Sequence, residues 1–400
     1  MKLKKGMFLV EGEHKFSQRV QTIRFSGIRK LFDLAQKMEG IISLGIGEPD
    51  FGTPTHIKEA AKRALDEGYT HYTPNAGFSD LREALSEKVQ RENGLDYSPD
   101  EVIVSDGGCT GSFLLAMLAL VDPGEEVIVS NPYFVVHEAA IKIAGATPIF
   151  VPLNEENDFR MLPEDVESAV SPKTKMIVIN SPCNPTGGVL RKEDFEGIAE
   201  IARRHDLYVL ADEVYEKMVY EGMRHYSIAS FDHMRNRTVT VNSFSKTYAM
   251  TGWRIGYAVG DGRIIDQMVK LQQYTMVHAP AISQRAAIAA LKGPQDFVME
   301  MVQIFDKRRR FITDRLNEIK GFHCLVPKGA FYVFPNIESL GKTSEELADF
   351  LVKEGYVVTC PGSAFGSNGE GYLRISYARP LDQLQEACDR VEHAISNLPR

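Results

Sequence analysis

The chain has 400 residues, of which 44% are hydrophobic and 25% charged, and its formal net charge is −8. This length exceeds that of most single domains and predicts two domains that share an interface. Lys and Arg are spread along the chain, which argues against a nucleic-acid-binding surface. The apolar run 7–10 is too short for a signal-peptide core, and no later stretch approaches the length of a membrane span.

The five cysteines are widely scattered and include no C-x-x-C pair. No His or Cys residues have the spacing of metal ligands, so we expect no metal site. An odd, scattered set of cysteines is typical of a reduced protein, and we expect a cytoplasmic one.

Short apolar runs alternate with longer helical stretches from about Val102 to Val259. The predicted strands are Val102–Ser105, Glu126–Ser130, Thr147–Val151, Met176–Asn180, Tyr208–Ala211, Val239–Asn242 and Ile255–Val259. The predicted helices between them include Ser112–Leu120, Val135–Ala144 and Lys192–Arg204. This alternation predicts an α/β fold with a largely parallel sheet that is covered by helices on both faces.

The pattern changes after about residue 290. A long charged helix is predicted over 295–319, short strands around 330–335 and 372–377, and a final helix from Leu381. We expect a large domain at 46–290. The small α+β domain is expected to combine 291–400 with the N-terminal segment 1–45, which has no strand–helix alternation of its own.

Lys246 directly follows a predicted buried strand, among small hydroxyl residues. Burial disfavours the charged ammonium group and lowers the pKa of a lysine. A neutral amine is the form that attacks an aldehyde to make an imine. Ser243, Ser245 and Arg254 can bind a phosphate dianion close to this lysine. The alternative is a surface lysine, with Arg254 in a structural ion pair.

Asp212 ends another predicted strand, in the segment Ala211–Tyr215. A buried carboxylate is costly unless it meets a cation. A protonated pyridine nitrogen is such a cation, and Tyr215 can then reach a ring oxygen. The alternative is that Asp212 pairs with an arginine of the core.

A glycine-rich turn with Gly108 and Cys109 lies between a predicted strand and a predicted helix. Such backbone N–H groups and a helix N-terminus favour an anion, although the turn is neither a P-loop nor a dinucleotide fingerprint. Phe134 follows the next strand and can stack on a flat ring, or it belongs to the core.

Asn184 and Arg374 are candidates for binding a carboxylate. Asn184 begins the turn Asn-Pro-Thr-Gly, which can hold its amide rigidly or can simply be a tight turn. Arg374 lies on a predicted strand, and its guanidinium is suited to gripping a carboxylate through two hydrogen bonds. The alternative for Arg374 is an exposed edge residue.

Together and in this order, these segments resemble the class I/II, fold-type-I aminotransferases that depend on pyridoxal phosphate, the aspartate/aromatic aminotransferase superfamily. The matching segments are 45–50 (GIGEPD), 72–77 (YTPNAG), 184–187 (NPTG), 212–215 (DEVY), 243–257 (SFSKTYAMTGWRIGY) and Arg374. The resemblance covers nearly the whole chain. It implies a large domain with a mainly parallel seven-stranded sheet between helices, and a smaller α+β domain.

The resemblance implies that pyridoxal 5′-phosphate is the cofactor and that Lys246 holds it as a Schiff base. Lys246 would also move the substrate proton, and Asp212 would keep the pyridine nitrogen protonated. The other implied contacts are Tyr215 and Asn184 with the phenolic oxygen, Phe134 on the ring, and Gly108, Cys109, Ser243, Ser245 and Arg254 around the phosphate.

The resemblance also implies a reaction and an assembly. Arg374, Asn184 and the backbone of Gly47 would bind the α-carboxylate of the substrate. The amino group would pass from an L-amino acid, aspartate or aromatic, to 2-oxoglutarate in two half-reactions. A tyrosine matching Tyr72 reaches the phosphate of the neighbouring subunit in this family, which implies a homodimer with composite active sites.

Two departures from the family pattern bear on the substrate. Cys109 stands where aspartate-preferring relatives often have a lysine for the distal carboxylate, and Phe134 stands where a tryptophan is frequent. The cysteine at position 109 weakens the assignment of aspartate as the preferred substrate and leaves broad specificity open. Arg29 can supply a distal cation from the N-terminal segment, or it is an exposed helix residue.

Other readings share parts of this pattern. A pyridoxal-phosphate-dependent C–S β-lyase would use nearly all the same cofactor residues. A regulator that only senses the cofactor needs a fused DNA-binding module, for which about 45 residues before the core leave little room. The absence of a dinucleotide fingerprint argues against a nicotinamide-dependent oxidoreductase.

Overall fold

The computed structural model describes residues 16–23 and 38–399. Its largest sheet consists of β2 (Val102–Asp106), β3 (Glu126–Asn131), β4 (Thr147–Pro152), β5 (Thr174–Asn180), β6 (Tyr208–Asp212), β7 (Thr238–Ser243) and β8 (Ile255–Gly260). The spatial order is β2-β8-β7-β6-β5-β3-β4. Neighbouring strands pair in parallel except β8, which is antiparallel to β2 and β7. The seven predicted strands and the mainly parallel sheet are therefore confirmed.

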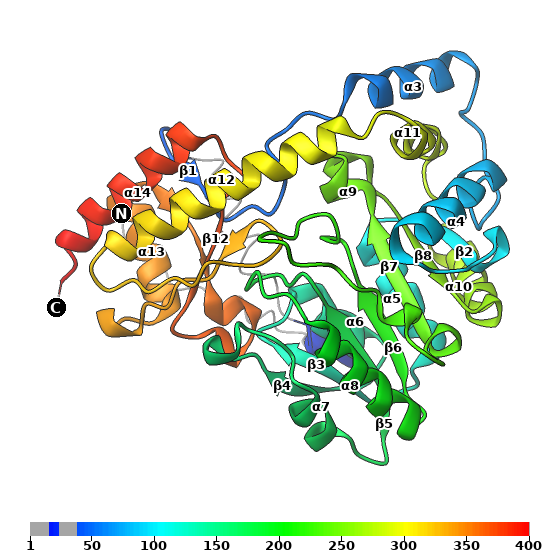
Figure 1. Ribbon diagram of the computed structural model, residues 1–400, viewed down its shortest axis with the longest axis horizontal. Helices are drawn as coiled ribbons and strands as arrows, with labels where there is room; N and C mark the ends of the chain where they lie inside the picture. Colours follow the sequence, from blue (N-terminus) through cyan, green and yellow to red (C-terminus); the bar gives the residue numbers. More distant parts are fainter. Residues whose placement is uncertain (1–15, 24–37, 400) are drawn as a thin grey trace.

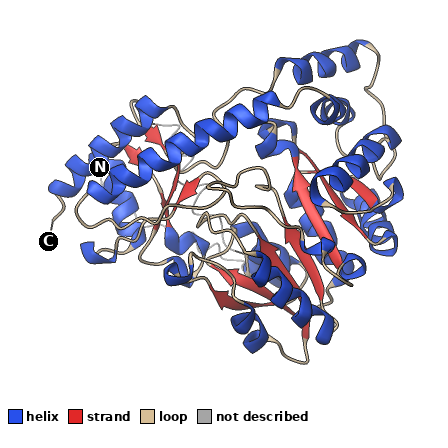
Figure 2. Ribbon diagram, in the orientation of Figure 1, coloured by secondary structure: helices blue, strands red, loops and turns tan. Residues whose placement is uncertain are grey.

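Helices cover both faces of this sheet (Figures 1 and 2). One face carries α5 (Cys109–Leu120), α6 (Val135–Ile143) and α10 (Gly262–Thr275). The other face carries α3 (Thr55–Asp66), α4 (Ser79–Asn93), α7 (Pro163–Ala169), α8 (Lys192–Arg204) and α11 (Ala281–Lys292). Side chains alternate along a strand, so Val127 and Val129 pack toward α5 whereas Ile128 packs toward α8.

The C-terminal part contains two small sheets. The strands β9 (Tyr332–Val333), β11 (Cys360–Pro361) and β12 (Leu373–Ser376) form an antiparallel sheet. The strand β1 (Ile42–Ser43) pairs in parallel with β10 (Val357–Val358). The helices of this part are α12 (Asp296–Glu318), α13 (Ser344–Gly355) and α14 (Leu381–Ser396). The predicted long helix and final helix are thus confirmed.

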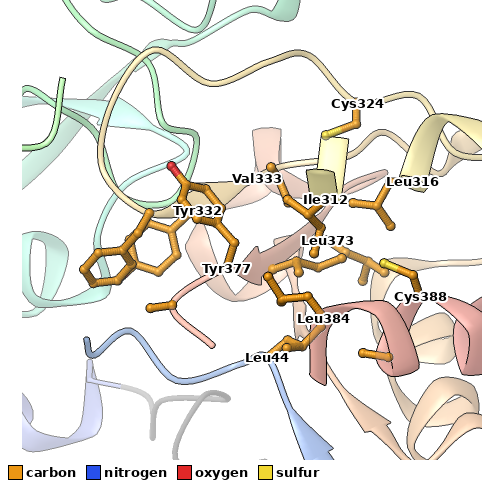
Figure 3. Packing of buried hydrophobic residues seen from close by; sticks show 14 of the residues in the cluster. Leu44, Ile312, Leu316, Cys324, Tyr332, Val333, Leu373, Tyr377, Leu384 and Cys388 are labelled. Atoms are coloured by element: carbon orange, nitrogen blue, oxygen red, sulfur yellow. The ribbon is translucent and has the colours of Figure 1, made fainter. Parts of the chain in front are cut away.

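An apolar cluster holds the C-terminal part together. In Figure 3, Tyr332 and Tyr377 lie at one end of this cluster, and Cys388 of α14 lies at the other. The same cluster includes Tyr215, which follows β6 of the large sheet. The C-terminal elements are therefore packed directly against the end of a strand of the large sheet.

The polar residues that end the parallel strands of the large sheet lie at one edge, because these strands run in the same direction. Asn180 and Asp212 are paired at the ends of β5 and β6, and Ser243 ends β7. Because β8 runs in the opposite direction, its first residues lie at this same edge, where Gly256 pairs with Ser243. Ligand sites of such sheets form at the carboxyl ends of the parallel strands.

Two further helices, α9 (Phe244–Thr247) and α1 (Gln18–Gln21), are only four residues long. The helix α9 connects β7 to the turn before β8, and α1 lies beside α6. Over the described ranges, no helix combines the length and the apolar character that crossing a membrane requires.

Candidate active site

A cavity of about 300 Å³ opens at the carboxyl edge of the large sheet, next to the C-terminal part. Twelve of the residues that the sequence singled out line it: Gly47, Gly108, Cys109, Phe134, Asn184, Asp212, Tyr215, Ser243, Ser245, Lys246, Arg254 and Arg374. Tyr72 does not line this cavity. Arg29 lies outside the described residues.

Lys246 extends into the cavity from α9, and its Nζ donates a hydrogen bond to the carbonyl oxygen of Gly47. Burial lowers the pKa of Lys246 to about 8, although the negative charge of Glu48 acts in the opposite direction. About a tenth of the amine is therefore neutral at pH 7, far more than for an ordinary lysine. Lys246 is not a surface lysine.

Asp212 ends β6 and is only 2% exposed. Its Oδ2 lies 3.0 Å from Nε2 of His137, and its Oδ1 accepts the backbone N–H of Val214 at 3.3 Å. Burial raises the pKa of the Cys109 thiol, so this thiol stays protonated and donates to Asp212 Oδ1 at 3.5 Å. None of the described partners of Asp212 is an arginine, which removes the alternative that it pairs with an arginine of the core.

Gly108 faces a group of hydrogen-bond donors. A Cβ atom on Gly108 would lie 3.3 Å from Ser243 Oγ, 3.5 Å from Arg254 Nη2 and 3.6 Å from Ser245 Oγ. The φ angle of Gly108 is +69°, a conformation that glycine adopts at little cost. This bare backbone, the N-terminus of α5, two hydroxyls and a guanidinium together make a cradle for a compact anion such as phosphate.

Arg254 lies directly before β8 and reaches across to the glycine-rich turn. It donates from Nη1 to the carbonyl oxygen of Thr251 at 2.8 Å, and from Nη2 to that of Gly107. No carboxylate of the described residues forms an ion pair with it. Its positive charge is therefore available to an anion in the cradle.

Arg374 on β12 is only 2% exposed, which excludes the alternative of an exposed edge residue. It donates to Asn184 Oδ1 at 3.0 Å, to the carbonyl oxygen of Gly45, and to Cys360 Sγ at 3.4 Å. Its Nε has no hydrogen-bond partner among the described residues. A buried guanidinium that has no carboxylate partner among the described residues is suited to bind a carboxylate.

Phe134 also lines the cavity, at the residue before α6. Its ring meets the ring of His137 edge to face, with a centroid distance of 5.6 Å. The ring of His137 in turn stacks on Phe113 at 4.6 Å. These aromatic contacts fix both Phe134 and the imidazole that holds Asp212.

Tyr72 lies elsewhere. Its side chain is 88% exposed, and its ring meets His278 edge to face at 5.6 Å. This ring is therefore accessible at the surface of the subunit.

The sequence did not single out two residues of the site, His137 and Tyr332. His137 is buried on the first turn of α6, 75 residues before Asp212 in the chain. Tyr332 on β9 lines the cavity, and its hydroxyl lies 2.8 Å from that of Tyr215. A histidine three residues after Phe134, on a predicted helix, was a signal for the first residue. A tyrosine on a two-residue strand gives no such signal in the sequence.

Comparison with known proteins places this arrangement in a family. Residues 39–391 match the family "Aminotransferase class I and II". The chain is 48% identical over 381 residues to an aspartate aminotransferase of Pyrococcus abyssi, covering 95% of this chain and 98% of the relative. It is also 48% identical over 381 residues to aromatic-amino-acid aminotransferase 2 of Thermococcus litoralis, with the same coverage.

A solved structure gives the same result. The crystal structure of an aspartate aminotransferase from Rhizobium meliloti superimposes with a TM-score of 0.92 at 38% identity, covering 96% of this chain and 100% of the other. The fold is thus the fold type I of the aspartate aminotransferases, as the resemblance implied. The chain belongs to the class I and II aminotransferases, enzymes that generally depend on pyridoxal phosphate.

Proposed function

We propose that this enzyme moves an amino group from an L-amino acid, aspartate or aromatic, to 2-oxoglutarate. The observation that carries the proposal is the meeting of Lys246, Asp212 and Arg374 in one cavity. The names of the relatives from Pyrococcus abyssi and Thermococcus litoralis supply the two donor classes, at equal identity. We therefore propose both aspartate and aromatic amino acids as donors.

We propose pyridoxal 5′-phosphate as the cofactor, because the side chains present suit its functional groups. The cradle of Gly108, Ser243, Ser245 and Arg254 would take the phosphate. The buried carboxylate of Asp212 would hold a proton on the ring nitrogen. When bound, the cofactor supplies an aldehyde that exchanges amino groups and a ring that withdraws electrons from the substrate.

Lys246 would act as the general base on the substrate. Its pKa of about 8 allows the neutral amine to accept the proton at Cα and to return it. His137 and the Cys109 thiol both contact Asp212, and these contacts keep its carboxylate oriented while the charge in the site changes. Tyr215 and Asn184 would bind the phenolic oxygen, and Phe134 would cover one face of the ring.

Arg374 and Asn184 would bind the α-carboxylate, together with the backbone of Gly47. Arg374 is already oriented by three acceptors, so little side-chain entropy remains to be lost when the substrate binds. Nη1 carries two N–H groups and donates to one acceptor among the described residues, Asn184, which supports this role. Arg29 remains a candidate for the distal group of a dicarboxylate.

The assay that tests the function is a panel of L-amino acids with 2-oxoglutarate on purified protein. We expect glutamate to form, fastest with aspartate or aromatic donors, and we expect Lys246→Ala to form none. Release of pyruvate and ammonia without an acceptor would identify a C–S β-lyase instead. Absence of glutamate with every donor contradicts the proposal.

We also propose a homodimer in which Tyr72 completes the site of the partner subunit, which its 88% exposure supports. Mixing Lys246→Ala with Tyr72→Ala subunits tests this arrangement. A hybrid dimer would contain one site with both native residues, so activity should reappear on mixing. If each subunit uses its own Tyr72, no hybrid site is complete and mixing restores nothing.

We also propose a large domain at 46–290 and a small domain of 1–45 with 291–400. The pairing of β1 with β10 supports assigning Ile42–Ser43 to the small domain. The contact between α1 and α6 does not support extending it to Gln18–Gln21. All five cysteines are free thiols, which is compatible with the reducing cytoplasm that we expect.

A further inference from the structure

Tyr332 contacts several parts of the site at once. It lies on β9, is only 1% exposed, and lines the cavity. Its hydroxyl oxygen is 2.8 Å from the hydroxyl oxygen of Tyr215. In Figure 3 it stands at one end of the apolar cluster of the C-terminal part, which fixes its ring.

The ring and the hydroxyl of Tyr332 have different neighbours. The guanidinium carbon of Arg374 lies 4.6 Å from the ring centroid, within the range of a cation–π contact. A Cβ atom on Gly47 would lie 2.0 Å from the Tyr332 hydroxyl, so only glycine fits there. The carbonyl of that same glycine accepts the hydrogen bond from Lys246. Tyr332 therefore adjoins three groups that the proposed function assigns to the substrate and cofactor.

Which of the two hydroxyls donates to the other depends on where each directs its single proton. Each hydroxyl has one proton, and either oxygen can accept the bond between them. If Tyr215 turns its proton toward an anionic oxygen in the cavity, its own oxygen can only accept from Tyr332. Burial raises the pKa of both tyrosines, so both keep their protons at neutral pH.

We propose that Tyr332 is a positioning residue that donates its hydroxyl proton to Tyr215 and thereby directs the Tyr215 proton into the cavity. This inference rests on the proposed function, in which Tyr215 binds the phenolic oxygen of the cofactor. Chains of hydrogen bonds polarise one another, so the bond from Tyr332 strengthens Tyr215 as a donor to that oxygen. The ring of Tyr332 separately holds the Arg374 guanidinium in place.

The first test is Tyr332→Phe, which removes the hydroxyl and keeps the ring. The readout is the pH titration of the visible absorbance of the bound cofactor. A weaker donor stabilises the deprotonated phenolic oxygen less, so the midpoint should rise by about 0.4 to 1 pH unit. The matched control is Tyr220→Phe. That hydroxyl is also buried but donates to the carbonyl oxygen of Ala330, and its loss should leave the midpoint unchanged.

A double variant shows whether Tyr332 acts through Tyr215. If it does, Tyr215→Phe combined with Tyr332→Phe should titrate like Tyr215→Phe alone. Additive shifts overturn the proposed relay. Equal midpoints for wild type, Tyr332→Phe and Tyr220→Phe overturn it as well.

The contact between the Tyr332 ring and Arg374 is tested separately, through KM for the amino acid. Tyr332→Leu removes one of the two aromatic rings that contact Arg374, the other being Phe365. It should raise KM for the amino acid about 3- to 30-fold, whereas Tyr332→Phe should change it less than about twofold. Equal KM values for the two variants overturn this part. If wild-type protein gave no cofactor absorbance at all, the proposed function would fail. A wild type that binds cofactor and transaminates, beside an unshifted Tyr332→Phe, overturns only the role of Tyr332.

Discussion

Arg374 Nη1 donates a hydrogen bond to Asn184 Oδ1 at 3.0 Å, which joins a strand of the C-terminal sheet to the turn after β5. The same guanidinium is held by the carbonyl oxygen of Gly45 and by Cys360 Sγ. A guanidinium that is 2% exposed and has no carboxylate partner among the described residues is costly. A substrate carboxylate would supply the missing counter-charge.

Replacing Arg374 with lysine should weaken substrate binding more than it slows the chemistry. The ammonium group keeps the charge but cannot form two parallel hydrogen bonds with a carboxylate. We expect KM for the amino acid to rise about 10- to 100-fold, the loss of one charge-assisted hydrogen bond. Initial rates at varied donor concentration measure this change.

Arg379→Lys is the matched control for that variant. Arg379 also donates to a backbone carbonyl, that of Ser43, at 3.1 Å, but it does not line the cavity. Its KM should stay close to that of the wild type. Equal KM values for the two variants would show that Arg374 does not bind the substrate.

The pKa of Lys246, which burial lowers to about 8, predicts how cofactor capture depends on pH. Only the neutral amine attacks an aldehyde, and its fraction rises about tenfold per pH unit below the pKa. Capture of pyridoxal phosphate by the apo protein should therefore accelerate up to about pH 8 and then level off. Stopped-flow absorbance across this range measures the rate, and a rate that is independent of pH contradicts the prediction.

The same pKa makes a prediction about stability. A lysine in the unfolded chain titrates near 10.5, whereas Lys246 in the folded protein titrates near 8. The folded state thus binds fewer protons between these values, and the stability of the apo protein rises with pH across this interval. Lys246→Met should therefore raise the Tm of the apo protein most below pH 8, and progressively less toward pH 10.5. A gain in Tm that is the same at all pH values would point to packing instead.

The sequence predicted the large sheet well because each buried strand is a short apolar run with a helical stretch after it. Since such strands end at one edge, Asp212 and Ser243 could be placed together before any contact was known. The strands β10 and β11 were not predicted, because two-residue strands show no periodicity. His137 and Tyr332 were missed because their contacts join segments 75 and 117 residues apart.

The position of Cys109 predicts a change of substrate preference. Cys109 begins α5 and lines the cavity, at the place where the resemblance puts a lysine in aspartate-preferring relatives. In Cys109→Lys, an ammonium group could bind the distal carboxylate of aspartate, while an aromatic donor gains nothing. We expect the ratio of kcat/KM for aspartate to that for phenylalanine to rise about tenfold or more.

Cys109→Ser is the control, because it alters the contact with Asp212 without adding charge. Its ratio should stay within about threefold of the wild type. A ratio that rises equally in both variants would assign the effect to the lost thiol. A ratio that does not rise in Cys109→Lys contradicts the prediction.

The buried pair Lys88–Glu216 predicts a stability effect behind the site. Lys88 on α4 and Glu216, the residue after Tyr215, have side chains only 5% and 6% exposed, and they form a direct ion pair. Burial alone would raise the pKa of Glu216, but Lys88, His225 and Lys217 together outweigh it and lower that pKa to about 2. This pair anchors the segment that carries Tyr215.

Lys88→Met leaves the Glu216 carboxylate buried without its cation, and we expect it to lower the free energy of unfolding by about 3–5 kcal/mol. Lys88→Met combined with Glu216→Leu should cost less than the single change, because no unpaired charge remains. Since the pKa of Glu216 is lower in the folded state than its ordinary value of 4.5, the wild-type contribution is complete above that value and is lost as the pH falls toward 2. Urea unfolding at neutral and acidic pH measures both effects. Lys62→Met, in the exposed pair with Glu59, is the control. If Lys88→Met and Lys62→Met unfold at the same urea concentration, the buried pair does not stabilise the fold.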